Sequence, residues 1–361
     1  MNLCALPNPM VPRSPGRAIA SILLGLALLS PLAVRADDIV LGLTKGDVQV
    51  LTAGRAQPVP VRKGQALRSG DRVYTGGDGW TVMLMPDGSR VVLTANSEFM
   101  VRSHDAKRRK GTFALLGGML RAIISASSVS PANYRFNTLT AVAGVRGTDF
   151  SMINRGQANV FFGNNGKVEV QGLNTAIRPL TAATVVQTTR GELPTQPISV
   201  EPNSRLAEAQ TLLNAVTEQA PASWVEAGKL PEIVARWNIT YSRYLADAGR
   251  HDEALHVLQV ALDLTDAVEI QVDARLERGA VLSRDPGGAN AALKEYEKVL
   301  DSPVVGPQRE TALYMMGMGY FQLKQPVEAQ SRLRQYLSDY PEGRYKERVE
   351  TLLRTIKGVA P

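Results

Sequence analysis

Residues 133–172 read NYRFNTLTAVAGVRGTDFSMINRGQANVFFGNNGKVEVQG and are the most informative segment for the fold of the first half. Three apolar-rich runs, DFSMI, ANVFF and KVEV, are separated by NRGQ and GNNG, and both separators consist of residues that favour turns. This spacing predicts short strands joined as hairpins. Glycines at 144 and 147 indicate a backbone that bends or approaches its neighbours closely. No catalytic arrangement is visible in this stretch.

Short apolar runs separated by turn residues continue on both sides of this stretch, over residues 37–186. One example is Pro86-Asp87-Gly88, which lies between two apolar runs and predicts a hairpin. We expect an all-β domain of many short strands, about ten to twelve, arranged either as a stacked solenoid or as a sandwich.

The composition changes near residue 190. Residues 187–203 contain three prolines and few apolar side chains, which predicts a semi-rigid linker. From residue 204 onward the apolar period becomes helical, and Ser204 is the expected N-cap of the first helix. The sequence therefore predicts a multidomain chain, β then α, with a β domain over 37–186 and a helical domain over 204–361. The apolar face of that first helix consists of Leu206, Ala209, Leu213 and Val216.

The first 36 residues have the layout of a secretory signal peptide. Arg13 and Arg17 precede an apolar core over residues 18–29, and Ala36 is a small residue at the expected cleavage site. The core is shorter than the roughly 17–25 residues that span a membrane, and an uncleaved signal anchor is the alternative. Cleavage would also remove Cys4, the chain's one cysteine, and leave a mildly basic chain without disulfides. These features predict a periplasmic protein of a Gram-negative bacterium, with no nucleic-acid partner and no membrane span after signal removal.

Three segments of the helical half resemble one another. They begin at His251, Ala289 and Pro326, and aligning them places Ala254, Ala292 and Ala329 in register. The period is a few residues longer than that of the tetratricopeptide repeat, a helix-turn-helix unit, which residues 232–341 resemble. The resemblance implies a solenoid of about three helical hairpins. The best-matching residues are Tyr241, Gly249, Ala261, Leu262, Gly317, Tyr320 and Pro341.

Three segments of the β half together resemble the FecR domain, a periplasmic β module, over about residues 40–175. They are LRSGDRVYT at 67–75, PDGS at 86–89 and VRGTDF at 145–150. Named members of the family are inner-membrane regulators that relay a signal from an outer-membrane transporter to a cytoplasmic sigma factor. Only a short proline-rich segment precedes the apolar core here, so we carry over the module and not the sigma-regulating role. The motif residues expected to be structural are Gly70, Asp71, Asp87, Gly88, Arg146, Gly147 and Thr148.

The helical half carries the sharpest site hypothesis. In stacked helical hairpins the first helix of each unit lines a concave surface. Aligning the three alanines then predicts a partner-binding groove, with arginines at one end and aromatic and methionine side chains at the other. Such a groove suits a peptide with acidic and apolar anchors. The alternative is that a C-terminal helix over 345–356 covers the aromatic end. The groove residues are Arg236, Arg243, Glu277, Arg284, Tyr314, Met318 and Phe321.

The segment Arg146-Gly147-Thr148 has two interpretations. Arginine donates hydrogen bonds in a fork and a glycine turn exposes backbone amides, so the segment suits an anionic ligand. We favour the structural alternative, in which Arg146 binds carbonyls or an acid where the chain turns. The basic run Lys107–Lys110 is expected to be a solvated hairpin tip.

The sequence contains neither a nucleophile elbow nor a phosphate-binding P-loop. His251 and His256 do not share a helix face, which argues against zinc. We therefore expect no catalytic residue, cofactor or metal site.

Together these features favour a periplasmic, non-enzymatic adaptor that binds envelope proteins or peptide segments through its helical repeats. Two alternatives stay open. One is binding of cell-wall polysaccharide or peptidoglycan by the β module. The other is a FecR-type envelope signalling regulator, which requires the apolar segment to stay uncut.

Overall fold

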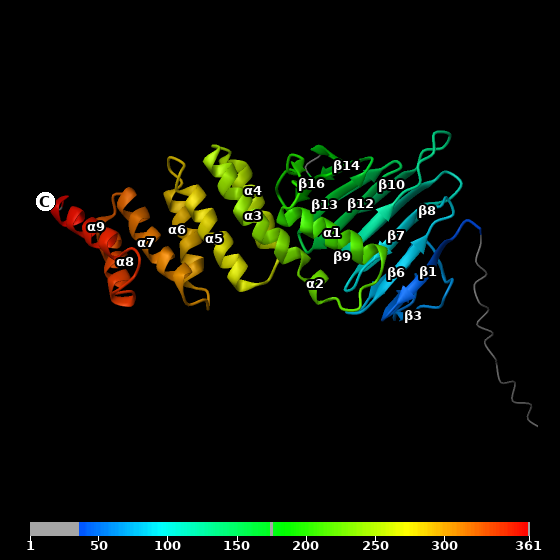
Figure 1. Cartoon of the computed structure of the whole chain (residues 1–361), viewed down its shortest axis with the longest axis horizontal. Coiled ribbons are helices and arrows are strands. Elements are labelled where there is room, and N and C mark those ends of the chain that lie inside the picture. The colour runs from blue at the N-terminus through cyan, green and yellow to red at the C-terminus, as the bar shows by residue number, and fades with distance from the viewer. Residues whose placement is uncertain (1–35, 174–175, 360–361) are drawn as a thin grey trace, which may run out of the picture. The chain divides into compact units, whose positions relative to one another are not determined.

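The computed structural model describes residues 36–173 and 176–359. A many-stranded β half is followed by a helical half, as the sequence predicts (Figure 1). The described residues of the two halves belong to one compact unit. The expected signal peptide lies outside the described residues. Among those that are described, no helix combines the length and apolar character that crossing a bilayer requires.

The strands form two sheets, called sheet A and sheet B here, which share one long strand. Sheet A consists, in spatial order, of β4 (Ala66–Leu67), β1 (Ile39–Lys45), β6 (Trp80–Leu84), β7 (Arg90–Leu93), the second half of β9 (Lys110–Ile123), β12 (Asp149–Arg155), β13 (Ala158–Asn165), β16 (Thr184–Thr188) and β17 (Ile198–Ser199).

Sheet B contains the first half of β9, which pairs in parallel with β10, whereas the other strands pair antiparallel. In spatial order it consists of β3 (Val59–Pro60), β2 (Val48–Leu51), β5 (Arg72–Thr75), β8 (Glu98–Asp105), β9, β10 (Asn133–Asn137), β11 (Ala141–Val145), β14 (Lys167–Gly172) and β15 (Ile177–Thr181).

Strand β9 passes from sheet B to sheet A between Gly117 and Gly118. Gly117 pairs with β8, whereas Gly118 pairs with β12. Gly118 has a φ of +95°, and a Cβ there would lie 2.5 Å from the Cα of Ser97. Only glycine fits this bend, because a side chain would meet both backbone strain and a clash. The described residues contain seventeen strands, so the sequence expectation of ten to twelve was too low, in part because three of them comprise only two residues and carry no apolar run.

Two of the predicted hairpins are confirmed and one is wrong. Strands β6 and β7 pair across the Pro86-Asp87-Gly88 turn, and β12 pairs with β13. No hairpin joins β13 to β14, because β13 pairs with β12 and β16 in sheet A and β14 with β11 and β15 in sheet B. The turn GNNG therefore carries the chain between the sheets.

The main core lies between the two sheets, which makes this half a sandwich. A row of stacked and edge-on aromatic rings crosses the core from sheet B to sheet A. Ring centroids are 5.7 Å apart for Phe99 and Phe113, 5.2 Å for Phe113 and Phe136, and 5.4 Å for Phe136 and Phe150. Such contacts stabilise the core beyond the burial of their apolar area.

Helices cover the other face of sheet A. The described residues form α1 (Arg205–Glu218), α2 (Val225–Gly228), α3 (Leu230–Asp247), α4 (His251–Leu264), α5 (Val268–Leu282), α6 (Ala289–Leu300), α7 (Pro307–Gln322), α8 (Pro326–Asp339) and α9 (Lys346–Val359). Helix α1 lies against β7, β9 and β12, and α4 against β13 and β16 (Figure 1).

Helix α1 confirms its sequence prediction. The Ser204 hydroxyl accepts a hydrogen bond from the Ala207 amide at 3.1 Å, and the predicted apolar face is buried. That face packs on sheet A together with α3 and α4, in one apolar cluster with Ile153, Val160 and Phe162. The residues expected to form a linker, 187–203, contain the end of β16 and all of β17.

The remaining helices form antiparallel hairpins: α3 packs on α4, α5 on α6 and α7 on α8. The first helix α3 also contacts α5, α5 contacts α7, and α9 packs on α8. The aligned residues Ala254, Ala292 and Ala329 are buried in the second helices. Small residues are needed at these contacts, since a Cβ on Gly279 would lie 2.4 Å from the Tyr296 ring.

Candidate functional site

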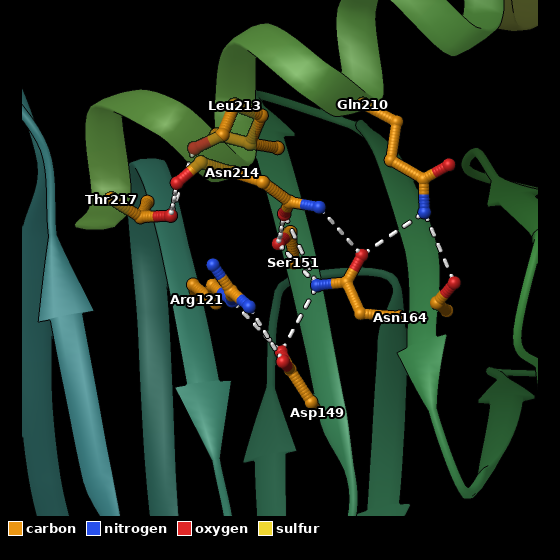
Figure 2. Close-up of polar contacts among 9 residues, drawn as sticks. Arg121, Asp149, Ser151, Asn164, Gln210, Leu213, Asn214 and Thr217 are labelled. Carbon is orange, nitrogen blue, oxygen red and sulfur yellow. Dashed lines mark hydrogen bonds and ion pairs between the residues drawn. The ribbon is translucent and has the colours of Figure 1, made fainter.

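A polar network joins α1 to sheet A (Figure 2). Arg121 of β9 forms a two-bond ion pair with Asp149 of β12, at 2.9 and 2.7 Å. The Asn164 amide donates to Asp149 at 3.0 Å and exchanges hydrogen bonds with Asn214 of α1 at 2.9 and 3.1 Å. Ser151 donates to Asn214 at 2.7 Å. The network therefore fixes one face of α1 on the strands.

A second junction holds α3. The side-chain amides of Gln187 in β16 and Asn238 in α3 are both fully buried and exchange hydrogen bonds at 2.9 and 2.7 Å. The Trp80 indole of β6 donates to the Val216 carbonyl of α1 at 3.0 Å. Because buried polar groups are costly to leave unpaired, these contacts specify one arrangement of helices on the sheet. The first helical hairpin is thus rigidly held.

The predicted groove begins on the face of α3 and α5, where the structure brings the arginines together with acids. Arg243 and Glu277 are 2.6 Å apart, and Arg236 and Asp273 are 3.9 Å apart. Arg284, just after α5, lies 2.7 Å from Asp247 at the end of α3. Each predicted arginine therefore has a carboxylate partner from the neighbouring helix or turn. The face presents alternating charges.

The aromatic end of the predicted groove is largely covered. Tyr314 of α7 stacks on Tyr345, with ring centroids 4.3 Å apart and planes 8° apart. Phe321 packs in a cluster that includes Leu352 and Leu353 of α9. Met318 is half-buried. These contacts agree with the alternative that the C-terminal helix covers this end.

Sequence reasoning missed two acids and one aromatic row. Asp247 lies four residues after Arg243 and Asp273 four before Glu277, so both could have been found from helical i, i+4 spacing. On α3 the rings of Trp237, Tyr241 and Tyr244 stack in sequence, with centroids 4.6 and 6.0 Å apart. Tyr244 is 64% exposed, so an aromatic ring is available to a partner beside the charged face.

In the β half, the side chain of Asp87 in the PDGS motif is buried and connects three segments of the chain. It accepts hydrogen bonds from the Ser89 amide at 2.9 Å, the Tyr134 hydroxyl at 2.9 Å and the Arg109 guanidinium at 3.0 Å. Burial alone would raise the pKa of Asp87, but these donors outweigh it and hold the pKa below its usual value. Arg109 is thus drawn inward, unlike the solvated tip expected for Lys107–Lys110.

Other motif residues shape turns, as expected. Asp71 is buried, and its carboxylate accepts from the backbone amides of Ala53 and Arg68 at 2.8 and 2.9 Å. Gly70, Gly88 and Gly147 have φ values of +96°, +81° and +89°, which favour glycine. The backbone carbonyl of Thr148 accepts from Ile124 at 2.8 Å.

Residues 71–191 match the FecR protein family. The match covers about a third of the chain and contains the PDGS and VRGTDF segments, with the Asp71 turn at its first residue. It confirms the FecR resemblance of the β half, which is called the FecR region from here on. The comparison with curated proteins found no match.

Two solved structures show distant likenesses. A candidate anti-sigma factor from Parabacteroides distasonis is 14% identical with a TM-score of 0.32, over 38% of this chain and 63% of that protein. The chain therefore spans less than two thirds of that protein's length. The tetratricopeptide-containing C-terminal domain of a candidate FK506-binding protein from Plasmodium falciparum is 15% identical with a TM-score of 0.30, over 36% of this chain and 90% of that domain. At these TM-scores neither likeness supports an inference.

In the part of the chain that the structure describes, Arg146 of the FecR region lacks the contacts that the structural role we favoured for it would require. Arg146 is exposed, and within the described residues it has no hydrogen bond or ion pair. It lines a surface hollow together with Arg135 and Lys167. Its side chain is therefore free to meet a ligand.

The histidines do not form a metal site. His251 binds Asp285 at 2.5 Å, whereas His256 is half-buried, and burial lowers its pKa. Within residues 36–173 and 176–359, no cluster of three or more histidine, cysteine or acidic side chains has the geometry to hold a metal ion.

Proposed function

We propose that the protein is a non-enzymatic adaptor of the cell envelope, which binds a protein partner through the surface of α3 and α5. The secretory pattern of the first 36 residues supports an envelope location. The FecR match over residues 71–191 supports a role without chemistry, because the resemblance implies a regulatory module and not an enzyme.

One observation carries the proposal: an exposed aromatic and arginine surface on a helix that the sheet holds rigid. Tyrosine, tryptophan and arginine are the residues that most often dominate binding energy at protein interfaces. On α3, Tyr244 is exposed and directly follows Arg243, so its ring lies on the adjoining side of the helix. The Gln187–Asn238 hydrogen bonds and the shared apolar cluster fix this helix in advance. A preformed surface lowers the entropy cost of binding.

Replacing Tyr244 with alanine is expected to weaken capture of the partner at least about tenfold, since a central tyrosine contributes 2 kcal/mol or more. The fold should be unaffected, because most of the ring is exposed. The measurement is affinity capture from envelope extracts with the immobilised mature chain. Val327→Ala is the matched control, as Val327 is 75% exposed on α8, away from this face. Equal capture by wild type and Tyr244→Ala would contradict the proposal.

Reversing the charges of the Arg243–Glu277 pair tests whether this pair acts in partner binding or only in folding. Arg243→Glu places two carboxylates together, whereas adding Glu277→Arg restores an ion pair with reversed direction. Arg243 is 60% exposed and Glu277 12%. Because the pair reaches solvent at its arginine end, it contributes only about 1 kcal/mol, so both variants should fold. We expect capture to be lost in both variants, because the partner meets a reversed charge pattern. Recovery of capture in the double variant would mean that the pair serves the fold alone.

A second candidate, an envelope signalling regulator, is favoured by the FecR match over residues 71–191. It requires the apolar segment of residues 18–29 to remain attached as an anchor. Mass spectrometry of the purified protein decides between the two: a chain that starts at Asp37 favours the soluble adaptor, and an intact N-terminus favours the regulator.

A further inference from the structure

The outer face of sheet B carries a hollow of about 360 Å³ over β10, β11 and β14. Arg135, Gly144 and Glu169 lie side by side across these three strands. Neighbouring strands are about 4.8 Å apart, so Arg135 and Glu169 stand roughly 10 Å apart with only a glycine between them. The volume falls in the range of small-molecule sites.

Three cations surround this hollow, and they have no partners in the described part of the chain. Arg135, Arg146 and Lys167 are exposed, and none forms a hydrogen bond or an ion pair there. Arg146 directly follows Val145, which pairs with Val168, so Arg146 lies next to Lys167. The arginines on α3 and α5 are each neutralised by a carboxylate, whereas these three leave a local excess of positive charge. An anion placed between them would be attracted by all three.

Gly144 forms the floor of the hollow, although the fold does not require glycine there. A Cβ on Gly144 would meet only the Glu169 carbonyl, at an ordinary 3.8 Å, and its φ is not in the left-handed region. Gly163 differs, because a Cβ there would lie 1.9 Å from the Thr181 carbonyl. Glycine is unfavourable in a strand, and it often marks a place where a ligand approaches the backbone. Since neither backbone conformation nor a clash requires glycine here, we assign Gly144 to the close approach of a ligand.

The wall of the hollow also includes Thr148, which is 5% exposed. Its hydroxyl is buried and has no hydrogen-bond partner. Unpartnered buried polar groups are rare in native proteins and call for a specific explanation. This observation is independent of the surface charges.

We propose that the hollow binds a phosphate-bearing sugar. Two guanidinium groups and an ammonium group suit a phosphate dianion, since arginine donates two parallel hydrogen bonds to phosphate oxygens. Glu169 would repel a bare anion, but its carboxylate accepts hydrogen bonds from sugar hydroxyls. A ligand with a phosphate at one end and hydroxyls at the other therefore satisfies all four charged groups. A free sugar phosphate has this chemistry, and the headgroup of phosphatidylglycerol shares it in part, with a singly charged phosphodiester next to glycerol hydroxyls.

The test titrates the mature chain, residues 37–361, with glucose 6-phosphate by isothermal calorimetry. Binding is expected for glucose 6-phosphate and not for glucose. Arg146→Glu and Gly144→Leu should each weaken it at least about tenfold, the first by charge and the second by filling the hollow. Arg55→Glu is the matched control, because Arg55 is an exposed arginine outside the hollow. Thermal unfolding checks that the variants keep their fold.

A second arm identifies the source of the ligand by co-sedimentation with phosphatidylglycerol vesicles. Vesicle binding that is lost in Gly144→Leu supports the site and assigns it to a lipid headgroup. Glu169→Gln should reduce the preference for glucose 6-phosphate over inorganic phosphate, and an unchanged preference would overturn the assignment of a sugar. The whole proposal is overturned if neither probe binds, or if Arg146→Glu and Gly144→Leu bind as wild type does.

Discussion

Cutting the chain after Val186 is expected to leave a β half that does not fold stably. The cut removes α1, α3 and α4, which cover sheet A. Five buried apolar side chains would face water: Met119, Ile153, Val160, Phe162 and Val185. At roughly 1.5–3 kcal/mol each, the loss is on the order of 10 kcal/mol. A typical domain is stable by only about 5–15 kcal/mol.

The matched fragment ends at Leu264 and retains α1 to α4. We expect residues 37–264 to be soluble and to unfold cooperatively, because sheet A keeps its cover and repeat arrays tolerate loss of terminal units. Residues 37–186 should aggregate or bind an apolar dye. Circular dichroism during thermal unfolding measures both fragments. A short fragment that unfolds cooperatively at the same temperature as the long one would show that the halves are independent.

Replacing Asp87 with alanine is expected to destabilise the protein by about 3–5 kcal/mol, because it leaves the Arg109 guanidinium buried beside a cavity. The side chains of Asp87 and Arg109 are only 8% and 11% exposed. Asp105→Ala is the matched control, since Asp105 pairs with Arg108 at the exposed end of the hairpin that also carries Arg109. That change should cost less than about 1 kcal/mol. Urea unfolding of the three proteins gives the comparison, and equal midpoints would contradict the role of Asp87.

The same carboxylate predicts a pH dependence. The pKa of Asp87 is lower in the folded chain than its ordinary value of 3.8. Its stabilising contribution is therefore fully present above about pH 4 and is lost as the pH falls through the folded pKa. The difference in unfolding midpoint between wild type and Asp87→Asn should shrink below pH 3.8. A difference that does not change with pH would exclude this titration.

The sequence was most informative where local patterns decide the structure. The apolar face of α1 and its Ser204 cap follow from helical spacing, and the three buried alanines follow from the repeat. The path of β9 through both sheets could not be predicted from the sequence, because strand pairing is set by residues far apart in the chain. The cover on sheet A was missed for the same reason, as α1 looks like the start of a separate helical domain.

In the candidate sites, too, features set by local sequence patterns could be predicted and features set by long-range contacts could not. The positions of Arg236, Arg243 and Glu277 on adjacent first helices followed from aligning the repeats. Asp273 and Asp247 were missed, although each lies four residues from a predicted groove residue on its own helix. Their pairing with Arg236 and Arg284 across helices depends on how neighbouring helices are rotated. Asp87 resembles a simple turn residue, and its bond to Arg109 joins residues from two distant hairpins. The hollow around Gly144 requires three strands in register, which no local pattern reveals.

We propose above that the protein works by offering the α3 and α5 surface to another protein. Site-specific photo-crosslinking in native cells tests it most directly, with a benzophenone side chain in place of Thr240, which is exposed between Arg236 and Arg243 on α3. Val327 on the distant α8 serves as the matched position. We predict one dominant crosslinked protein from position 240 and none from position 327. No product from position 240, or the same products from both positions, would contradict the claim.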